Sequence, residues 1–256
     1  MSVDDSQDAG LRWEAVTASA ARVRLAPWDC GAALVRTPVG PLLVDAGADL
    51  RQGAALREAA RARAGAPVAC VAFTHPHFDH VLGAAALSGA RGYGAAGIGS
   101  ALLAGPGPGG LAALRADALR EGAEPGAVAR ACAALGGPGS PAAAPVEVAG
   151  ELWLGPPGGG VLLVALGAAH SPCDLAVVVP GAGGEPPVVF CGDLVEESGP
   201  PQAGQDAAPG RWPAALDRLL ALGGPDARYV PGHGAVVDAA FVRRQRDALA
   251  RRFRTG

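Results

Sequence analysis

The sequence predicts a layered α/β protein whose two halves have similar architecture. Short apolar segments typical of strands alternate with segments of helical length, and each half contains strands followed by a helix, a strand and a helix. Half of the 256 residues are apolar, which is enough for a large core. No linker demands a second domain. We therefore expect one domain over residues 1–256, with residues 1–20 as a flexible N-terminal segment.

The first half begins with three predicted strands, at 21–27, 31–37 and 40–49, with a turn between the last two. A helix is expected at 50–64, because Asp49 supplies an N-cap and Gly65 a stop signal. A short buried strand at 68–73 and a helix at 79–88 follow.

Residues 89–150 are rich in Gly, Ala and Pro and form a predicted insertion with helices at 111–121 and 126–135. The insertion is either a flexible surface segment or a helical pair that covers a pocket.

The second half contains predicted strands at 161–166, 175–180 and 188–193, a helix at 212–222, a strand at 227–232 and an Arg-rich helix at 239–254 capped by Asp238.

Charge and cysteine content narrow the protein class. The net charge is −3 and every basic residue is Arg, a balance that argues against a nucleic-acid binder. The N-terminal segment is acidic and has no apolar core, so no secretory signal is expected, and no run of about 18 apolar residues predicts a membrane span. Five scattered cysteines then indicate reduced thiols and a cytoplasmic location.

The stretch THPHFDH carries most of the chemical information. It places His75, His77, Asp79 and His80 directly after an apolar strand. By chance, this pattern would occur about once in ten thousand chains of this composition. The proline after His75 favours an extended backbone, so that His77 points to the same side. We expect Asp79 at the N-cap of the next helix and His80 in its first turn, with all four side chains converging. Imidazole and carboxylate are the ligands that zinc and related divalent ions prefer.

The remaining histidines and two aspartates also follow predicted strands. His170 comes after the strand at 161–166, and His233 after the strand that starts at residue 227. Asp193 and Asp45 occupy two further strand ends. Open α/β sheets place their sites at the carboxyl ends of strands, so this distribution favours a functional site over scattered structural histidines.

These ordered motifs resemble the metallo-β-lactamase superfamily. THPHFDH, the later AHS, the GD of FCGDL and the GH of PGHG, preceded by VDAG, carry the resemblance from Asp45 to His233. The resemblance implies the family fold, a four-layer αβ/βα sandwich with the metal site at one edge of two sheets. The motif set is specific for the superfamily and weak for the substrate.

The resemblance also implies a site for two metal ions, expected to be two Zn²⁺. The first ion would be held by His75, His77 and His170. The second ion would be held by Asp79, His80 and His233. Asp193 would bridge both ions, and Asp45 would hold the motif loop from outside the ligand set. Two such ions lower the pKa of a bridging water, which then attacks an electrophilic carbonyl or phosphorus, while Asp79 orients the nucleophile.

Within the superfamily, the chain is most similar to the glyoxalase-II-like branch of ester and thioester hydrolases. HSPCDL, then GDL, a long loop to Trp212 and PGHG resemble bacterial members of that branch. β-Lactamases are often exported and use Lys or Asn to hold the substrate, whereas this chain has neither residue. We therefore expect zinc-dependent hydrolysis of a small ester or thioester, with a small-molecule substrate and no nucleic-acid or membrane partner.

Two other functions stay open at this point. Persulfide dioxygenases share the fold and bind one Fe²⁺ through counterparts of His75, of His77 or its neighbour in the motif, and of Asp193. A non-enzymatic metal scaffold, or a thiol sensor built on Cys173 and Cys191, is the third hypothesis, although buried small residues are the simpler interpretation of both cysteines.

Two aromatic residues and one loop are the remaining candidates near a substrate. Tyr93 and Trp212 are weak candidates for substrate contact, for which core packing is the better explanation. The loop 196–211 is either a lid or a connection.

Overall fold

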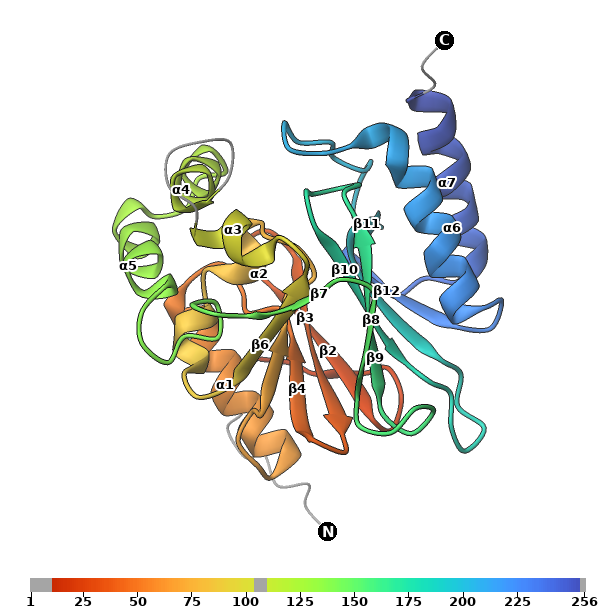
Figure 1. The fold of residues 1–256 in the computed structure, drawn as a ribbon, viewed down its shortest axis with the longest axis horizontal. Coiled ribbons are helices and arrows are strands. Elements are labelled where there is room, and N and C mark those ends of the chain that lie inside the picture. Colours follow the sequence, from red (N-terminus) through yellow and green to blue (C-terminus); the bar gives the residue numbers. More distant parts are fainter. Residues whose placement is uncertain (1–10, 104–109, 254–256) are drawn as a thin grey trace.

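The computed structural model describes residues 11–103 and 110–253, and it is a mixed α/β structure with helices on both outer faces of the strands (Figure 1). The strands of the first half are β1 (Glu14–Ala15), β2 (Ala20–Leu25), β3 (Cys30–Thr37), β4 (Gly40–Val44), β5 (Cys70–Ala72), β6 (Arg91–Ala95) and β7 (Val146–Val148). Its helices are α1 (Leu50–Ala64), α2 (Phe78–Val81), the 3₁₀ turn η1 (Ala84–Leu87), α3 (Ile98–Leu103), α4 (Gly110–Arg120) and α5 (Pro125–Leu135). The second half contains β8 (Glu151–Leu154), β9 (Val161–Gly167), β10 (Asp174–Val179), β11 (Val188–Glu196), β12 (Arg228–His233), the 3₁₀ turn η2 (Pro209–Arg211), α6 (Trp212–Gly223) and α7 (Ala239–Arg252).

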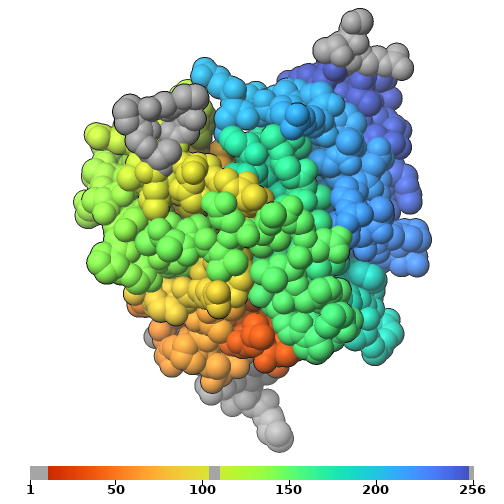
Figure 2. All heavy atoms as spheres, in the orientation of Figure 1, coloured from red at the N-terminus to blue at the C-terminus, as the bar shows by residue number. Residues whose placement is uncertain are grey.

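The two halves meet at a single strand junction. The hydrogen-bonded order is β7-β6-β5-β4-β3-β12-β11-β10-β9-β8, with β2 on β3 and β1 on β2. The only register pair between β3 and β12 joins Cys30 to His233. In the first half β4 to β7 run parallel, and in the second half β11 and β12 run parallel. On the face that Figure 2 shows, the colours of the first half lie mainly to the left and those of the second half mainly to the right.

Alternating side chains in the second half explain why it is covered on both faces. Every residue of β10 is buried. Leu175 and Val177 face the large core between the two halves, while Ala176 and Val178 join the cluster under α6 and α7. Successive side chains of a strand point to opposite faces of the sheet, so a strand with an apolar layer on each face is buried along its whole length. This is expected for a sheet that has a second sheet on one face and helices on the other.

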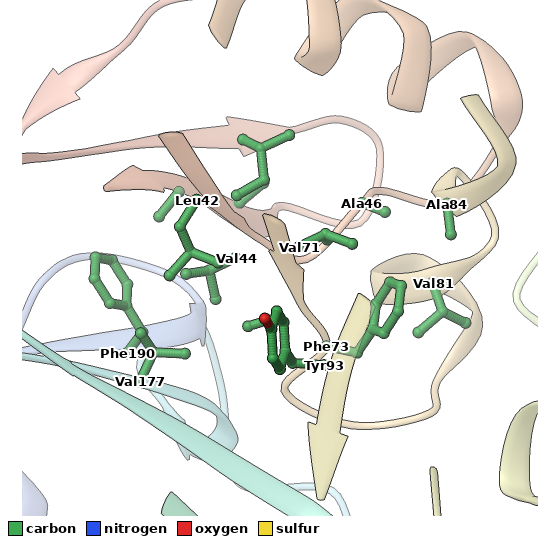
Figure 3. Packing of buried hydrophobic residues seen from close by; sticks show 14 of the residues in the cluster. Leu42, Val44, Ala46, Val71, Phe73, Val81, Ala84, Tyr93, Val177 and Phe190 are labelled. Atoms are coloured by element: carbon green, nitrogen blue, oxygen red, sulfur yellow. The ribbon is translucent and has the colours of Figure 1, made fainter. Parts of the chain in front are cut away.

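The large core joins the two halves. In Figure 3, Val177 and Phe190 of the second half lie on the side of Leu42 and Val44, and Tyr93 lies beside Phe73. Fully burying one such Leu, Val or Phe side chain contributes roughly 1.5–3 kcal/mol. With residues from both halves in one cluster, the fold is the four-layer arrangement expected from the sequence.

Several predicted elements are confirmed. The helix over 50–64 has the predicted bounds, and the Asp49 carboxylate accepts a hydrogen bond from the Gln52 backbone N–H at 2.7 Å. Asp238 likewise caps α7, which ends at Arg252; residue 254 of the predicted helix lies outside the described residues. None of the helices in the described ranges is long and apolar enough to cross a membrane.

The predicted helix over 79–88 is wrong as a single element. It consists of the short α2 and the 3₁₀ turn η1, separated at Leu82 and Gly83. A side chain at position 83 would place its Cβ 2.0 Å from the carbonyl oxygen of Ala46, so glycine is required for this close approach. The backbone N–H of Gly83 donates a hydrogen bond to the Gly47 carbonyl at 2.9 Å.

Residues 89–150 contribute strands as well as helices. β6 and β7 are members of the sheet, and α4 and α5 pack against each other and against α1, α2 and η1. Residues 104–109 of this stretch, and residues 1–10 of the expected flexible N-terminal segment, lie outside the described residues. Within 11–20, β1 pairs with β2.

Candidate metal centre

The first group of candidate ligands combines both halves of the fold. His75 and His77 follow β5, His170 follows β9, and Asp193 lies in β11. One ligand atom from each of these four residues lies within 4.8 Å of the others. Nδ1 of His77 is 3.0 Å from Nε2 of His170, and Asp193 Oδ2 is 3.6 Å from Nε2 of both His75 and His170. These are the three histidines and the carboxylate that the sequence motifs group together.

The second group shares Asp193 with the first. His80, Asp193 and His233 form a cluster with ligand atoms within 4.8 Å. Asp193 Oδ1 is 3.2 Å from His80 Nε2, and its Oδ2 is 3.3 Å from His233 Nε2. Asp79 is next to this cluster, with Oδ2 3.3 Å from His233 Nε2 and 3.6 Å from His80 Nε2. One carboxylate therefore faces both groups.

Asp45 organises the motif loop from behind. It is buried, follows β4 directly and has a positive φ of 63°, a conformation that non-glycine residues rarely adopt. Its carboxylate accepts from the Thr74 backbone N–H and hydroxyl, each at 2.8 Å, and from His80 Nδ1 at 2.8 Å. Asp45 is a strained residue held by three contacts, and these contacts fix the positions of the backbone before His75 and of the His80 ring.

Two further local features place the second-half residues. The Asp174 carboxylate accepts from the backbone N–H of His170 at 2.9 Å and from the Ser171 hydroxyl at 2.6 Å, which closes the turn after β9. At position 232, an added Cβ would lie 1.8 Å from Asp193 Oδ1, so only glycine lets β12 approach β11 this closely. The glycine before His233 is thus part of the site.

Most of the site histidines bond to other groups through the ring nitrogen that faces away from the clusters. These contacts join His75 Nδ1 to Thr74 Oγ1 at 2.9 Å, His80 Nδ1 to Asp45 at 2.8 Å, His233 Nδ1 to the Trp28 carbonyl at 2.8 Å and His77 Nε2 to Asp206 Oδ2 at 3.1 Å. Such partners fix the ring orientation and the tautomer of a metal-binding imidazole. The fifth imidazole, that of His170, packs against the Trp212 ring with centroids 5.2 Å apart.

The electrostatics of the first group favour neutral imidazoles at His75 and His170, whereas at His77 burial would lower the pKa but the Asp206 carboxylate raises it. Burial, together with the neighbouring His80, holds the pKa of His75 well below its usual value. Burial also lowers the pKa of His170 to about 4. Burial alone would raise the pKa of Asp193, yet His80 and His233 hold it well below the ordinary range. A neutral imidazole beside an ionised carboxylate is the form in which both groups bind a metal.

The second group behaves in the opposite way in the chain alone. Burial lowers the pKa of His233, but the carboxylates of Asp193 and Asp79 outweigh it and raise the value to about 12. Burial also opposes the shift at His80, whose pKa is raised well above normal by Cys30, Asp193 and other acids. The carboxylates of the second group are thus stabilised by positive charge close to them. Two imidazolium protons supply that charge in the chain alone, and a divalent cation could supply it in their place.

Unpartnered buried atoms show that the residues fit a cation. His75 Nε2 and Asp193 Oδ1 are buried and make no hydrogen bond among the described residues, although His80 Nε2 lies 3.2 Å from Asp193 Oδ1 as an ion-pair partner. Both belong to the clusters above, and such orphaned polar atoms are expensive unless something binds them. Imidazole and carboxylate donors in groups of three and four match the preferences of zinc and related divalent ions.

A family model decides the classification. The model of the metallo-beta-lactamase superfamily matches residues 26–233. The chain belongs to this superfamily. The matched residues include every candidate ligand, from His75 to His233, together with Asp45.

Solved structures show the superfamily fold. The metallo-β-lactamase FIM-1 from Pseudomonas aeruginosa, in a mono-zinc form, is 20% identical, with a TM-score of 0.64 over 94% of this chain and 95% of its own. The metallo-β-lactamase DIM-1 is 16% identical, with a TM-score of 0.66 over 94% of this chain and 98% of its own. VMB-1 is also 16% identical, with a TM-score of 0.65 over 94% and 97%. A search of curated proteins gave no match.

Two details of the superfamily motifs differ from the sequence-based predictions. Asp79 is not the N-cap of α2: His77 holds that position without a side-chain cap bond, and Asp79 lies in the first turn. Asp193 does not end its strand, because β11 continues to Glu196, with register shifts on both sides of Gly192. The irregular pairing lets the Asp193 side chain reach the site from within the strand.

The weaker candidates are buried. Tyr93 lies in the large core, and Trp212 is fully buried, with its indole N–H donating to the Leu194 carbonyl at 2.9 Å. Cys173 and Cys191 are also buried. Burial raises the pKa of both thiols, to about 12 for Cys173, which keeps them protonated and unreactive at neutral pH.

Three residues that contact the site were missed by the sequence analysis. Cys30 Sγ is 3.6 Å from His80 Nε2 and donates to the Asp79 carbonyl at 3.2 Å. Trp28 accepts from His233 through its carbonyl, and Asp206 contacts His77. Each lies in a loop or at a strand end far from its partner in sequence, where no motif marks it.

Proposed function

We propose that the chain is a metal-dependent hydrolase with a dinuclear zinc site that acts on a small ester or thioester. Superfamily membership supports metal-dependent hydrolytic chemistry in general. The ester or thioester preference comes from the motif resemblance to the glyoxalase-II-like branch. The similar solved structures are named as β-lactamases, so β-lactams belong among the substrates to be tested.

One observation carries the two-metal proposal. Asp193 faces two separate sets of histidines, one with His75, His77 and His170 and one with His80 and His233. Five imidazoles and this carboxylate are more ligands than one ion would bind, whereas two ions would use every histidine of the chain, with Asp193 within reach of both sets. The seven proposed ligands are His75, His77, Asp79, His80, His170, Asp193 and His233.

The residues of the chain would divide the work as follows. Two bound zinc ions would lower the pKa of a water molecule and polarise a substrate carbonyl. Asp193 balances the charge of both subsites from one position. Asp79 is the proposed catalytic residue, whose carboxylate would accept a hydrogen bond from the attacking water and orient it. Asp45 and Thr74 keep the motif loop in place, so that little reorganisation is needed when substrate binds.

Metal analysis combined with kinetics tests the proposal. The protein is purified without a chelator or a metal-binding tag, and zinc, iron and other metals are measured per chain. Wild type, His77→Ala and the control Asp226→Ala are then assayed with ester, thioester, lactone and β-lactam substrates. Asp226 is exposed and lies in the turn before β12, at the opposite end of that strand from His233.

The proposal predicts about two zinc ions per wild-type chain, and loss of hydrolysis in His77→Ala but not in Asp226→Ala. One iron per chain would instead favour the persulfide-dioxygenase hypothesis. No metal after zinc is added back, or equal hydrolysis in all three proteins, would contradict the proposal.

A cytoplasmic location and a small-molecule substrate remain part of the proposal. All five cysteines are unpaired, which is the state that a reducing compartment favours.

A further inference from the structure

The imidazole of His77 is bound differently from those of His75, His80 and His233. In these three residues Nδ1 contacts the outward partner and Nε2 faces the clusters. In His77 the ring is reversed: Nδ1 faces His170 Nε2 at 3.0 Å, and Nε2 is the outward nitrogen. A neutral ring that presents Nδ1 as a metal ligand must carry its proton on Nε2, so that proton needs an acceptor.

Asp206 is that acceptor. Its Oδ2 lies 3.1 Å from His77 Nε2, although the two residues are 129 positions apart in the sequence. A carboxylate is well suited to fix the orientation of a neutral imidazole. The hydrogen bond from the ring N–H to an ionised oxygen is charge-assisted and therefore strong. The contact is the only one that the described residues provide to Nε2 of His77.

The segment that carries Asp206 is itself fixed at the site. Asp206 lies between β11 and α6, and two residues later the backbone N–H of Ala208 donates to the Ala169 carbonyl at 2.8 Å. Ala169 is adjacent to His170. The same segment ends in Trp212, whose ring packs on the His170 imidazole. In Figure 1 this segment and α2 lie at the same end of the molecule.

We propose that Asp206 is a positioning residue of the first metal subsite: its carboxylate accepts a hydrogen bond from the Nε2–H of His77 and thereby holds Nδ1 toward the metal. The inference rests on the proposed function, since it needs a metal at His75, His77 and His170. In this inference the loop 196–211 orients a metal ligand, which is a role different from the lid and the connection considered from the sequence. A surface contact of no consequence is the competing explanation, because the Asp206 side chain is 37% exposed and exposed ion pairs contribute little.

Metal retention separates the two explanations. Wild type, Asp206→Ala, Asp206→Asn and the control Gln205→Ala are loaded with zinc and titrated with a chromophoric chelator. Gln205 is the exposed neighbour of Asp206 in the same loop. Cobalt substitution, followed by visible absorption, reports the ligand geometry of the bound ions independently of activity. The unfolding midpoint of each chelator-treated protein shows whether the variant folds.

We expect Asp206→Ala to bind one of its two metal ions roughly 10- to 100-fold more weakly, the loss typical of removing a ligand-orienting carboxylate. Asp206→Asn should retain part of that affinity, because its amide oxygen can still accept a hydrogen bond from the His77 Nε2–H. Gln205→Ala should match wild type, and the metal-free unfolding midpoints should all agree.

Three results would overturn the inference, and they differ from one another. Equal zinc affinities and cobalt spectra in Asp206→Ala and wild type would show that the contact is incidental. Equal weakening of both ions would mean that Asp206 acts on the whole site rather than on His77. Absence of bound metal in wild type would refute the proposed function, and the inference with it.

Discussion

Replacing Asp45 with alanine should reduce the free energy of unfolding by about 2–6 kcal/mol, even without metal. The carboxylate accepts three hydrogen bonds at 2.8 Å, from the Thr74 backbone N–H, the Thr74 hydroxyl and His80 Nδ1. The hydroxyl can turn to His75 Nδ1, which is 2.9 Å away. The other two donors would be left buried and unpaired, at about 1–3 kcal/mol each.

Backbone strain gives the same position a second test. Asp45 has a φ of 63°, which alanine tolerates poorly and glycine adopts freely. Asp45→Gly removes the same acceptor without that strain. It should therefore be about 1 kcal/mol more stable than Asp45→Ala.

Urea unfolding with a chelator present, followed by tryptophan fluorescence, measures both variants. Asp49→Ala is the matched control, since Asp49 makes one N-cap bond, worth about 1 kcal/mol, in the same part of the chain. If Asp45→Ala is no less stable than Asp49→Ala, the three contacts do not hold the motif loop and the reasoning is wrong.

Three further predictions follow from the site. Adding zinc to chelator-treated protein near neutral pH should release at least two protons per chain, since the raised pKa values of His80 and His233 keep both rings protonated until metal displaces those protons, and the pKa of His77 is raised as well. Calorimetry in buffers of different ionisation enthalpy measures this, and zinc affinity should increase with pH; pH-independent affinity would contradict it. Gly232→Ala should lose bound metal and about 1–3 kcal/mol of stability, because its Cβ would lie 1.8 Å from Asp193 Oδ1; wild-type metal content would refute the steric argument. Trp212→Phe should lose about 1 kcal/mol by urea unfolding, because the indole N–H bond is removed from a buried carbonyl; an unchanged midpoint would show that the bond is replaceable.

The sequence predicted the elements whose signals are local. Asp49 and Gly65 mark both ends of α1 because a cap bond and a left-handed stop depend only on nearby residues. The apolar runs of β9 and β10 are legible for a similar reason, since both faces of each strand are buried. The motif resemblance also grouped side chains that the structure brings together, although Asp79 lies in the first turn of α2 rather than at its N-cap.

The sequence could not predict features that depend on distant neighbours. The helix expected at 79–88 is interrupted because Gly83 packs against Ala46, a contact that no periodicity encodes. β6 was missed because two of its five residues, RGYGA, are glycine, and the segment becomes a strand only between β5 and β7. The contact between Asp206 and His77 spans 129 positions, and only the closed fold reveals it.

The division of the candidate ligands between the two halves has a consequence for assembly. His75, His77, Asp79 and His80 come from the first half, and His170, Asp193 and His233 from the second. No fragment that stops before β12 can therefore complete the site, and neither half alone can hold the shared carboxylate against both sets of histidines. Metal occupancy would then report on how the two halves pack. A chain that retains a cation at both positions has its halves in the correct register, and a mispaired chain would not bind both cations.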